Sequence, residues 1–311
     1  MTPAGDAGAH KGRVVASHGR DAMVEDESGT RLRCRLQSRR LAVVCGDLVH
    51  WKPAAGEGAE GLVTALLPRR TVLARLSQRG EAEPVAANLS QLAVVVAPIP
   101  AADFGLCDRY LAAAEWAGLR GCIVANKSDL ATAPGPLDQA LADYAAIGYP
   151  VVRTSKRTED GVRELALRLD GETSVLVGQS GVGKSSLTNR LVPGVEAAVD
   201  EVSRASESGR HTTTTSSLYR LPTGGELIDS PGVRDFAPPL PAPRGIAGGF
   251  REIAAAGAAC RFSDCLHGRE PGCAVIAAAA SGMIAARRLT SYRKLLDLAA
   301  DMAARSPRIR R

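Results

Sequence analysis

A glycine-rich loop that ends in a lysine and a serine is the clearest chemical signal in the sequence. Residues 178–185 read Gly-Gln-Ser-Gly-Val-Gly-Lys-Ser and match the pattern G-x-x-x-x-G-K-[ST], with an apolar strand expected before them and a helix after them. This context disfavours the alternative, a chance loop of small residues, because glycines and a helix N-terminus together aim N–H groups at phosphates. Lys184 is expected to act catalytically on the β- and γ-phosphates, and the Ser185 hydroxyl to ligate Mg²⁺. The expected phosphate-binding residues are Gly178, Gln179, Ser180, Gly181, Val182, Gly183, Lys184, Ser185 and Ser186.

A second motif predicts that the nucleotide carries guanine. Residues 126–129 read Asn-Lys-Ser-Asp, and an aspartate there accepts two hydrogen bonds from guanine that adenine does not offer. Lys127 is expected to lie along the base, and Asn126 to hold the neighbouring loops together. Taken alone, the Asn-Lys-Ser-Asp motif also fits the solvated cap of a helix. Residues 154–156, however, resemble the second guanine-contacting loop of GTPases. The expected guanine-contacting residues are Asn126, Lys127, Ser128, Asp129, Thr154, Ser155 and Lys156.

Two further segments predict how the site senses the γ-phosphate. An apolar run at 227–229 is expected to bring Asp229 toward Mg²⁺, with Gly232 following near the γ-phosphate. A run of four threonines at 212–215 is expected to lead into a strand over 216–221, and an edge strand is the alternative for the run itself. Thr213 and Thr214 are the candidates to ligate Mg²⁺ only while the γ-phosphate is present, as in an order–disorder switch.

The order of these motifs along the chain is unusual. In an ordinary GTPase the phosphate loop comes first and the guanine loops come last, whereas here the guanine loops at 126 and 154 precede the phosphate loop at 178. Every strand and helix needed is still present, so the order predicts a circular permutation, which close-lying domain termini make tolerable. The segment after Gly232 then leads directly into the C-terminal part, and γ-phosphate sensing is expected to move that part.

Three cysteines and a histidine predict a metal site near the C-terminus. Cys260, Cys265, His267 and Cys273 offer three thiolates and one imidazole, a closed tetrahedral set suited to one structural zinc ion. The alternative is three buried thiols beside a surface histidine. Clustering of the four residues in a chain without an export signal favours zinc. The seven cysteines are an odd number and unevenly spread, so a disulfide framework is not expected.

Composition and hydropathy set the background for these sites. The chain has 311 residues and a net charge of +6, and its 45% hydrophobic and 23% charged content excludes a wholly disordered protein. The first 13 residues lack the apolar stretch of a secretory signal. The longest strongly apolar stretch, at 92–96, is far shorter than the roughly 20 residues of a membrane helix. A cytoplasmic protein without membrane association is therefore expected.

Two kinds of periodicity predict the elements that position the motifs. Short β segments over 10–75, including a strictly alternating run at 31–36, predict a small antiparallel barrel of the OB-fold type, with any small β-sandwich as the alternative. Residues 76–88 are interpreted as a polar connector. Strands over 91–97, 121–125, 150–153 and 174–177 are expected to alternate with helices over 108–117, 137–147 and 159–169, which predicts a mostly parallel α/β sheet. The expected domains are an OB-fold RNA-binding domain over 1–77, a circularly permuted P-loop GTPase domain over 78–237, and a mainly helical zinc-binding domain with a basic tail over 238–311.

Basic residues gather at both ends of the expected GTPase domain. Residues 281–311 alone carry a net charge of +6 and are interpreted as a disordered arm that binds RNA. In the expected barrel, Arg31, Arg33 and Arg35 alternate onto one face, and Arg39 and Arg40 follow them. Solubility alone is the alternative explanation for this charge. The distribution favours a large RNA partner that is contacted at several points.

Taken together, these motifs resemble those of the ribosome small subunit-dependent GTPase A (RsgA/YjeQ) family. The resemblance rests on the permuted guanine motifs, Gly-Arg-His-Thr-Thr-Thr, Asp-Ser-Pro-Gly-Val and the Cys/His knuckle, and it extends from about residue 12 to residue 295. It implies a cytoplasmic monomeric GTPase that binds GTP and GDP with Mg²⁺, carries one structural Zn²⁺, and contacts the 30S subunit, its 16S rRNA and other maturation factors. It further implies that the 30S subunit stimulates hydrolysis and that hydrolysis serves late maturation of this subunit.

Two other functions remain as alternatives. One is an RNA-binding assembly factor that senses guanine nucleotide without significant hydrolysis, which the intact Lys184, Ser185 and Asp229 disfavour. The other is a permuted GTPase that serves another RNA or the large subunit, which the OB-like start and the Cys/His knuckle disfavour.

Two positions depart from the pattern of well-known GTPases. Ser155 stands where many GTPases have alanine, and the expected contact from this position is through the backbone alone. Val233 stands where Ras-like enzymes place the glutamine that orients the attacking water, so slow intrinsic hydrolysis is expected. His211, beside the threonine run, or a group supplied by the ribosome is the candidate substitute.

Overall fold

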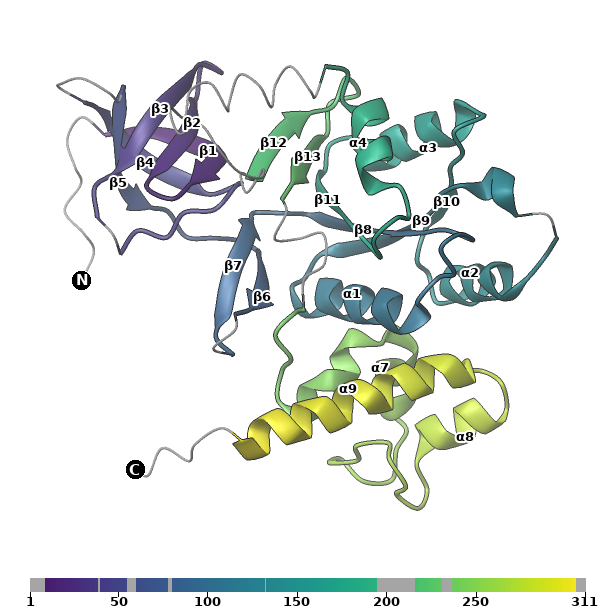
Figure 1. Ribbon diagram of the computed structural model, residues 1–311. Helices are drawn as coiled ribbons and strands as arrows, with labels where there is room; N and C mark the ends of the chain where they lie inside the picture. The colour runs from purple at the N-terminus through teal and green to yellow at the C-terminus, as the bar shows by residue number, and fades with distance from the viewer. Residues whose placement is uncertain are drawn as a thin grey trace, which may run out of the picture. The chain divides into compact units, whose positions relative to one another are not determined.

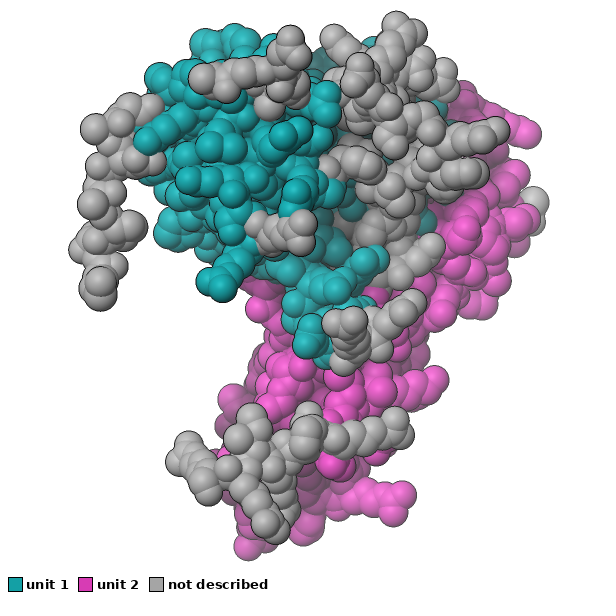
Figure 2. Space-filling model, turned by 60° about the vertical axis from the view of Figure 1, so that its left-hand side comes forward, with its two compact units in different colours: residues 1–90, 162–176, 183–236 teal, residues 91–161, 177–182, 237–311 magenta. Residues whose placement is uncertain are grey.

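The structure is a computed structural model, shown in Figure 1, that describes residues 9–38, 40–54, 60–77, 80–131, 133–194, 216–230 and 237–305. The chain forms two compact units, which Figure 2 colours separately. Unit 1 contains residues 1–90, 162–176 and 183–236, and unit 2 contains residues 91–161, 177–182 and 237–311. Each unit therefore takes up several separate stretches of the chain.

Unit 1 contains the expected five-stranded, OB-like barrel. Its strands are β1 (His10–His18), β2 (Asp21–Asp26), β3 (Arg31–Leu36), β4 (Leu48–Pro53) and β5 (Gly61–Leu66). The ring closes because β1 pairs with both β2 and β4, while β3 and β4 both pair with β5. Val14, Val24, Cys34, Val49 and Val63 fill its core with no exposed surface. The barrel prediction is confirmed, and β5 is a strand that the sequence patterns did not indicate.

The connector predicted over residues 76–88 is wrong, because most of it belongs to a hairpin. Strands β6 (Val72–Leu76) and β7 (Ala82–Ala87) pair in antiparallel register from Val72 opposite Ala87 to Leu76 opposite Ala82. The polar residues that suggested a connector lie mainly in the turn and in the exposed start of β7. The end of β7 is buried, and the Ala87 N–H donates to the carbonyl of Cys45 at 3.0 Å.

The sheet of unit 1 continues beyond the barrel. Strand β12 (Ser216–Arg220) pairs antiparallel with β1 on one side and with β13 (Glu226–Asp229) on the other. Strand β13 in turn pairs in parallel with β11 (Thr173–Val177). The helices α3 (Asp160–Leu169) and α4 (Lys184–Leu191) flank β11 in sequence.

Unit 2 holds the parallel strands β8 (Gln91–Val96), β9 (Arg120–Ala125) and β10 (Val151–Arg153) in the order β10-β9-β8. All six residues of β8 are buried, as expected for a strand covered on both faces. The connecting helices are α1 (Phe104–Trp116) and α2 (Pro136–Ala146), with a short 3₁₀ turn η1 (Ser128–Leu130) after β9. Helix α1 begins earlier than predicted because the Asp103 carboxylate caps it, accepting from the Leu106 N–H at 3.0 Å.

The C-terminal part of unit 2 is helical. It contains η2 (Pro243–Gly249), α7 (Arg251–Gly257), α8 (Ala274–Ala280) and α9 (Ala286–Arg305) around a core that includes Phe250, Ile253, Val275, Tyr292 and Leu295. The prediction of a disordered arm over 281–311 is therefore wrong for residues 286–305, which form α9. Residues 306–311 lie outside the described part of the chain. No helix in the described ranges is both long and apolar enough to span a membrane.

Two arginines of α9 are engaged inside the protein. Arg288 has no exposed surface, and its guanidinium donates to Asp108 Oδ1 at 2.8 Å and to Glu252 Oε1 at 2.7 Å. Arg287 donates to the Tyr144 hydroxyl at 2.8 Å. Carboxylates of α1 and α7 thus partly neutralise the positive charge of this segment, and the buried Arg288 is not available to contact RNA.

Candidate functional site

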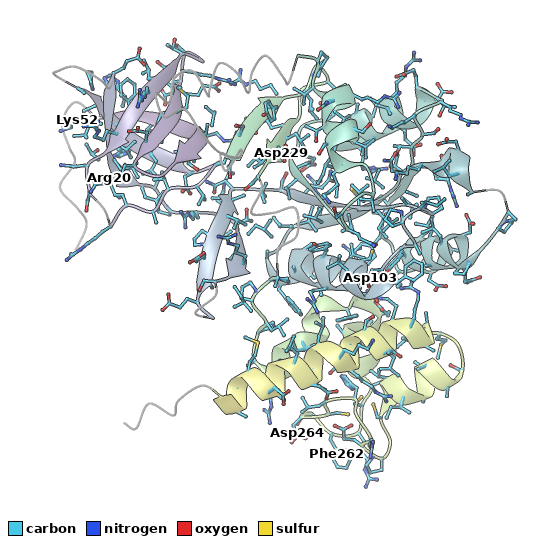
Figure 3. The ribbon with its side chains drawn as sticks, viewed as in Figure 1. Arg20, Lys52, Asp103, Asp229, Phe262 and Asp264 are labelled. Atoms are coloured by element: carbon cyan, nitrogen blue, oxygen red, sulfur yellow. The ribbon has the colours of Figure 1, made fainter. Side chains whose placement is uncertain are left out.

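The phosphate loop follows β11 and leads into α4, in the strand–loop–helix order expected from the sequence. Gly178 has φ +144°, and a Cβ added there would lie 2.2 Å from the Val95 carbonyl oxygen, so this position requires glycine. Gly183 has φ +100° and caps α4, whose first residue is Lys184. Gln179 accepts at 3.3 Å from the backbone N–H of Asp103, which Figure 3 shows at the start of α1. The conformation of the two glycines and the Gln179 hydrogen bond therefore fix the shape of the loop.

Asn126 joins three loops at one point, as the sequence predicts. It is 4% exposed, and its Nδ2 donates to the Val182 carbonyl of the phosphate loop at 2.9 Å. Its Oδ1 accepts from the Thr154 hydroxyl at 2.9 Å. Ser128 adds a second link, since its hydroxyl donates to the Thr154 carbonyl at 3.1 Å. The end of β9, the phosphate loop and the loop after β10 are thereby fixed to one another.

Lys127 reaches back to the phosphate loop. Its backbone is left-handed, with φ +56°, and its Nζ donates to the carbonyls of Ile99 at 2.8 Å and Gly181 at 2.7 Å. Because two carbonyls hold the ammonium, the aliphatic stem is fixed between loops, where it can cover one face of a base. A compact ammonium on a flexible stem suits this role better than a planar guanidinium.

Asp129 is oriented by the loop after β10. The Ser155 hydroxyl donates to Asp129 Oδ1 at 2.7 Å, and Arg157 approaches Oδ2 at 3.4 Å. The hydrogen bond from Ser155 holds the pKa of the Asp129 carboxyl below its ordinary value, so it stays an ionised acceptor at neutral pH. The expectation of a backbone contact alone at Ser155 missed this side-chain role. The sequence did carry a signal of this side-chain role. Alanine would be enough for a backbone contact at position 155, so the presence of a hydroxyl there indicates a side-chain contact.

Ser155→Ala is expected to weaken binding of GTP and GDP by about 10- to 100-fold, because hydrogen bonds to charged groups contribute about 1.5–3 kcal/mol. Ser281→Ala is the matched control, since its hydroxyl donates to the Ala278 carbonyl and lies outside the nucleotide loops, so nucleotide affinity should not change. Titration of a fluorescent guanine nucleotide measures both affinities. Equal affinities for the wild-type protein and Ser155→Ala would contradict the orienting role.

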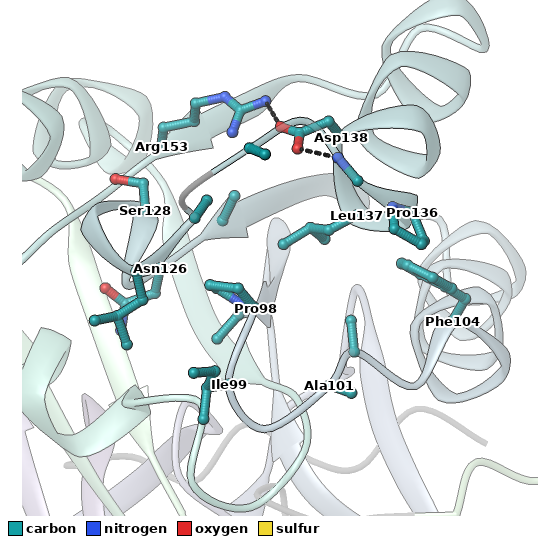
Figure 4. Close-up of a pocket in the computed structure, with 17 residues that line it drawn as sticks. Pro98, Ile99, Ala101, Phe104, Asn126, Ser128, Pro136, Leu137, Asp138 and Arg153 are labelled. Atoms are coloured by element: carbon teal, nitrogen blue, oxygen red, sulfur yellow. Dashed lines mark hydrogen bonds and ion pairs between the residues drawn. The ribbon is translucent and has the colours of Figure 1, made fainter.

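An apolar pocket of about 510 Å³ lies beside the Asn-Lys-Ser-Asp loop (Figure 4). Pro98, Phe104 and Leu137 are among its walls, and a 2.8 Å ion pair between Arg153 and Asp138 lies at its edge. Asn126 and Ser128 line it, whereas Lys127 and Asp129 do not. The pocket therefore shares Asn126 and Ser128 with the expected guanine-contacting set, and the side chains of Lys127 and Asp129 lie outside its lining.

On the Mg²⁺ side of the site, Ser185 and Asp229 are the candidate ligands within the described residues. Asp229 ends β13, as Figure 3 shows, and the next residue, Ser230, is 3% exposed and accepts from the Ser216 hydroxyl at 2.6 Å. Ser185 lies in the first turn of α4 and is exposed. The other residues predicted for this side lie outside the described part of the chain: His211, Thr213, Thr214, Gly232 and Val233.

The four predicted zinc ligands come together between α7 and α8. One donor atom from each of Cys260, Cys265, His267 and Cys273 lies within 4.8 Å of the others. Two sulfurs, those of Cys260 and Cys273, are 3.9 Å apart, and each lies 3.5 Å from His267 Nδ1. Zinc bond lengths in a tetrahedron separate two sulfurs by about 3.8 Å and a sulfur from a nitrogen by about 3.6 Å. The cluster therefore has the spacing of a metal site.

The surroundings also suit a metal ligand set. Burial lowers the pKa of His267 below its ordinary value, which favours the neutral imidazole that binds metals. Helix α9 supports the loop, because the Tyr292 hydroxyl donates to the Leu266 carbonyl at 2.8 Å and Arg293 donates to the Gly268 carbonyl at 2.9 Å. The residues present thus fit a structural zinc ion.

Comparisons with known proteins agree with these observations. Residues 66–238 match the model of a family described as RsgA GTPase. The chain is 45% identical over 299 residues to the small ribosomal subunit biogenesis GTPase RsgA of Azotobacter vinelandii, covering 94% of this chain and 87% of that protein. It is 44% identical over 299 residues to the protein of the same name from Ectopseudomonas mendocina, with the same coverage.

Two solved structures are also similar. YjeQ from Thermotoga maritima has a TM-score of 0.73 at 31% identity and is matched over 94% of this chain and 99% of that chain. YloQ, a circularly permuted GTPase, has the same TM-score at 23% identity over 97% of this chain and 99% of that chain, a likeness in fold. These matches agree with the permuted motif order found in the sequence.

Proposed function

The chain belongs to the RsgA GTPase family, and on this premise we propose that it binds the small ribosomal subunit and couples GTP hydrolysis to late maturation of that subunit. The observation that carries the guanine part of this proposal is the orientation of Asp129 by Ser155, beside a phosphate loop to which Asn126 and Lys127 are bonded. A carboxylate held in this way accepts from guanine and leaves adenine unmatched.

Within this function, the phosphate loop would hold the β- and γ-phosphates, with Lys184 countering the charge that develops during transfer. Ser185 and Asp229, with Thr213 or Thr214, would hold Mg²⁺, which neutralises phosphate charge when bound. Cys260, Cys265, His267 and Cys273 would hold one zinc ion with no open coordination position, which supplies structure and no chemistry.

Lys184→Ala is expected to lower kcat/KM for GTP hydrolysis by about 10²- to 10³-fold, because it removes one preorganised positive donor from the transferred phosphate. Lys294→Ala, which removes an exposed lysine from α9, is the control and should leave the rate unchanged. Phosphate release assays compare the two variants. A Lys184→Ala enzyme within about threefold of the wild-type rate would exclude this role.

The sequence offers two candidates for the group that orients the attacking water. Val233 cannot align a water molecule, so we infer that His211 or a group supplied by the ribosome does so. A His211→Ala enzyme should then lose ribosome-stimulated turnover while keeping its affinity for GTP. Undiminished stimulated turnover would exclude His211.

The proposed RNA partner is 16S rRNA of the 30S subunit, with other maturation factors as further partners, and we expect a monomer that acts in the cytoplasm. The arginines of β3 are partly neutralised, because Arg33 pairs with Asp21 at 3.0 Å and Arg31 pairs with Glu25 at 3.2 Å. Arg35 lies 4.0 Å from Asp21 and keeps 61% of its side chain exposed. It is therefore better placed than its neighbours to meet a phosphate.

One experiment separates the proposed function from its alternatives. Phosphate release from GTP is measured alone, with purified 30S subunits, and with purified 50S subunits. Stimulation by 30S alone is expected. Stimulation by neither subunit would favour a nucleotide-sensing assembly factor, and stimulation by 50S alone would favour a large-subunit role.

A further inference from the structure

A single strand separates the barrel from the residue proposed to ligate Mg²⁺. In unit 1, Ser217 of β12 lies opposite Ala16 of β1 on one side and opposite Asp229 of β13 on the other. Figure 1 shows β12 between β1 and β13. Because these strands belong to one hydrogen-bonded sheet, a displacement of β1 is transmitted to β12 and then to β13.

Side chains strengthen this connection across the strands. Arg13 of β1 donates from Nη1 to both carboxylate oxygens of Glu226 of β13, each at 2.6 Å, and from Nη2 to the Thr173 hydroxyl of β11 at 3.3 Å. The Thr173 hydroxyl in turn donates to Glu226 Oε2 at 2.7 Å. Arg13 and Glu226 keep only 23% and 20% of their side chains exposed, which limits screening by solvent.

A second ion pair joins the same parts of the protein. Arg220, at the end of β12, pairs with Glu25 of β2, and the Glu25 side chain is 9% exposed. We call the four charged residues Arg13, Glu25, Arg220 and Glu226 the barrel junction. At the start of β12, the Ser216 hydroxyl bonds that of Ser230, the residue after Asp229. Strand β12 is thus fixed to the barrel and to the neighbourhood of Asp229.

We propose that the barrel junction transmits RNA contact on the barrel to Asp229 and so sets how strongly the ribosomal subunit stimulates hydrolysis. This inference rests on the proposed function and adds the route of its regulation. Packed strands that share main-chain hydrogen bonds and a partly buried ion pair move together rather than independently.

The test removes the central ion pair and leaves the nucleotide site intact. Glu226→Gln and Arg13→Gln are expected to keep intrinsic hydrolysis and sedimentation with 30S subunits close to wild type. Stimulation at saturating 30S should fall by about 10-fold, within the usual range of coupling between sites. The double variant should be no worse than either single variant, and the reversed pair Arg13→Glu with Glu226→Arg should recover part of the stimulation.

Glu83→Gln is the matched control, because it removes a carboxylate from an ion pair that stays within the β6–β7 hairpin, to Arg75 at 3.4 Å. Stimulation should be unchanged in this variant.

Three results would overturn the coupling: full stimulation of Glu226→Gln, an equal loss of intrinsic and stimulated rates, or a loss explained by weaker 30S binding. Wild-type protein that 30S does not stimulate would instead overturn the proposed function, and the coupling with it. Melting temperatures of all the variants, compared with that of the wild-type protein, distinguish misfolding from lost coupling.

Discussion

Replacement of Cys273 by serine is expected to abolish tight zinc binding and to unfold the loop between α7 and α8. Structural zinc in small domains contributes on the order of 10–16 kcal/mol of apparent binding energy, and that energy is folding energy. Three remaining ligands would leave the tetrahedral set incomplete. The contacts of α9 with this loop, from Tyr292 to Leu266 and from Arg293 to Gly268, would be lost together with it.

Metal analysis and limited proteolysis check this result. The wild-type protein should carry one zinc per chain and resist cleavage between α7 and α8, while the variant should carry none and be cut there. Cys122→Ala is the control, because Cys122 is buried in β9, outside the ligand cluster, and should leave zinc content unchanged. Guanine nucleotide affinity should survive in both variants, since none of the four ligands belongs to the nucleotide loops. Full zinc content in Cys273→Ser would exclude the proposed ligand set.

Arg288→Ala is expected to lower the free energy of unfolding by about 3–5 kcal/mol, the usual cost of removing one partner from a buried ion pair. Asp108 has no exposed side-chain surface and the Glu252 side chain is 11% exposed, so both carboxylates would lose their main countercharge inside the protein. The side chain also packs over the Phe250 ring, with its guanidinium carbon 4.6 Å from the ring centroid. Replacing Arg288 by alanine therefore removes the countercharge of two carboxylates and the packing against Phe250.

Urea unfolding followed by tryptophan fluorescence measures this loss. The chain has two tryptophans, so a Trp51→Phe background leaves Trp116 of α1 as the reporter. Arg244→Ala is the control, because its pair with Asp264 is 79% and 67% exposed and should contribute less than about 1 kcal/mol. Replacing Arg288, Asp108 and Glu252 together by apolar residues should restore much of the stability. A loss below about 1 kcal/mol in Arg288→Ala would contradict the assignment.

The sequence predicted those parts of the site whose chemistry fixes the residue type. A phosphate loop requires glycine where a Cβ would strike another strand, as at Gly178 against Val95. Guanine reading requires a carboxylate, and a tetrahedral zinc site requires four ligands close together. Each of these requirements fixes the residue types within a short segment of the sequence. The order and spacing of the motifs were therefore enough to indicate a permuted GTPase with a metal site.

The features that the sequence did not predict depend on partners far away in the chain. The local sequence predicts that Arg288 is a charged surface residue. Only the fold brings Asp108, 180 residues earlier in the chain, beside it. The local sequence predicts that the end of β7 belongs to a polar connector. The fold buries this end of the strand and bonds the Ala87 N–H to the Cys45 carbonyl. The Ser155 hydroxyl acquires its role only when β9 and β10 place it beside Asp129. In each case a tertiary contact decided what local periodicity left open.

The internal pairing of arginines also bears on how ionic strength would affect binding to the small ribosomal subunit. Each cation that neutralises a phosphate releases condensed counterions, and the slope of log affinity against log salt concentration counts those cations. Arg287 and Arg288 pair with Asp108, and Arg69 pairs with Asp47 at 2.7 Å, so carboxylates of the protein itself already neutralise these guanidiniums. Affinity for the ribosomal subunit should therefore fall with added salt more gently than the 39 lysines and arginines of the chain would suggest.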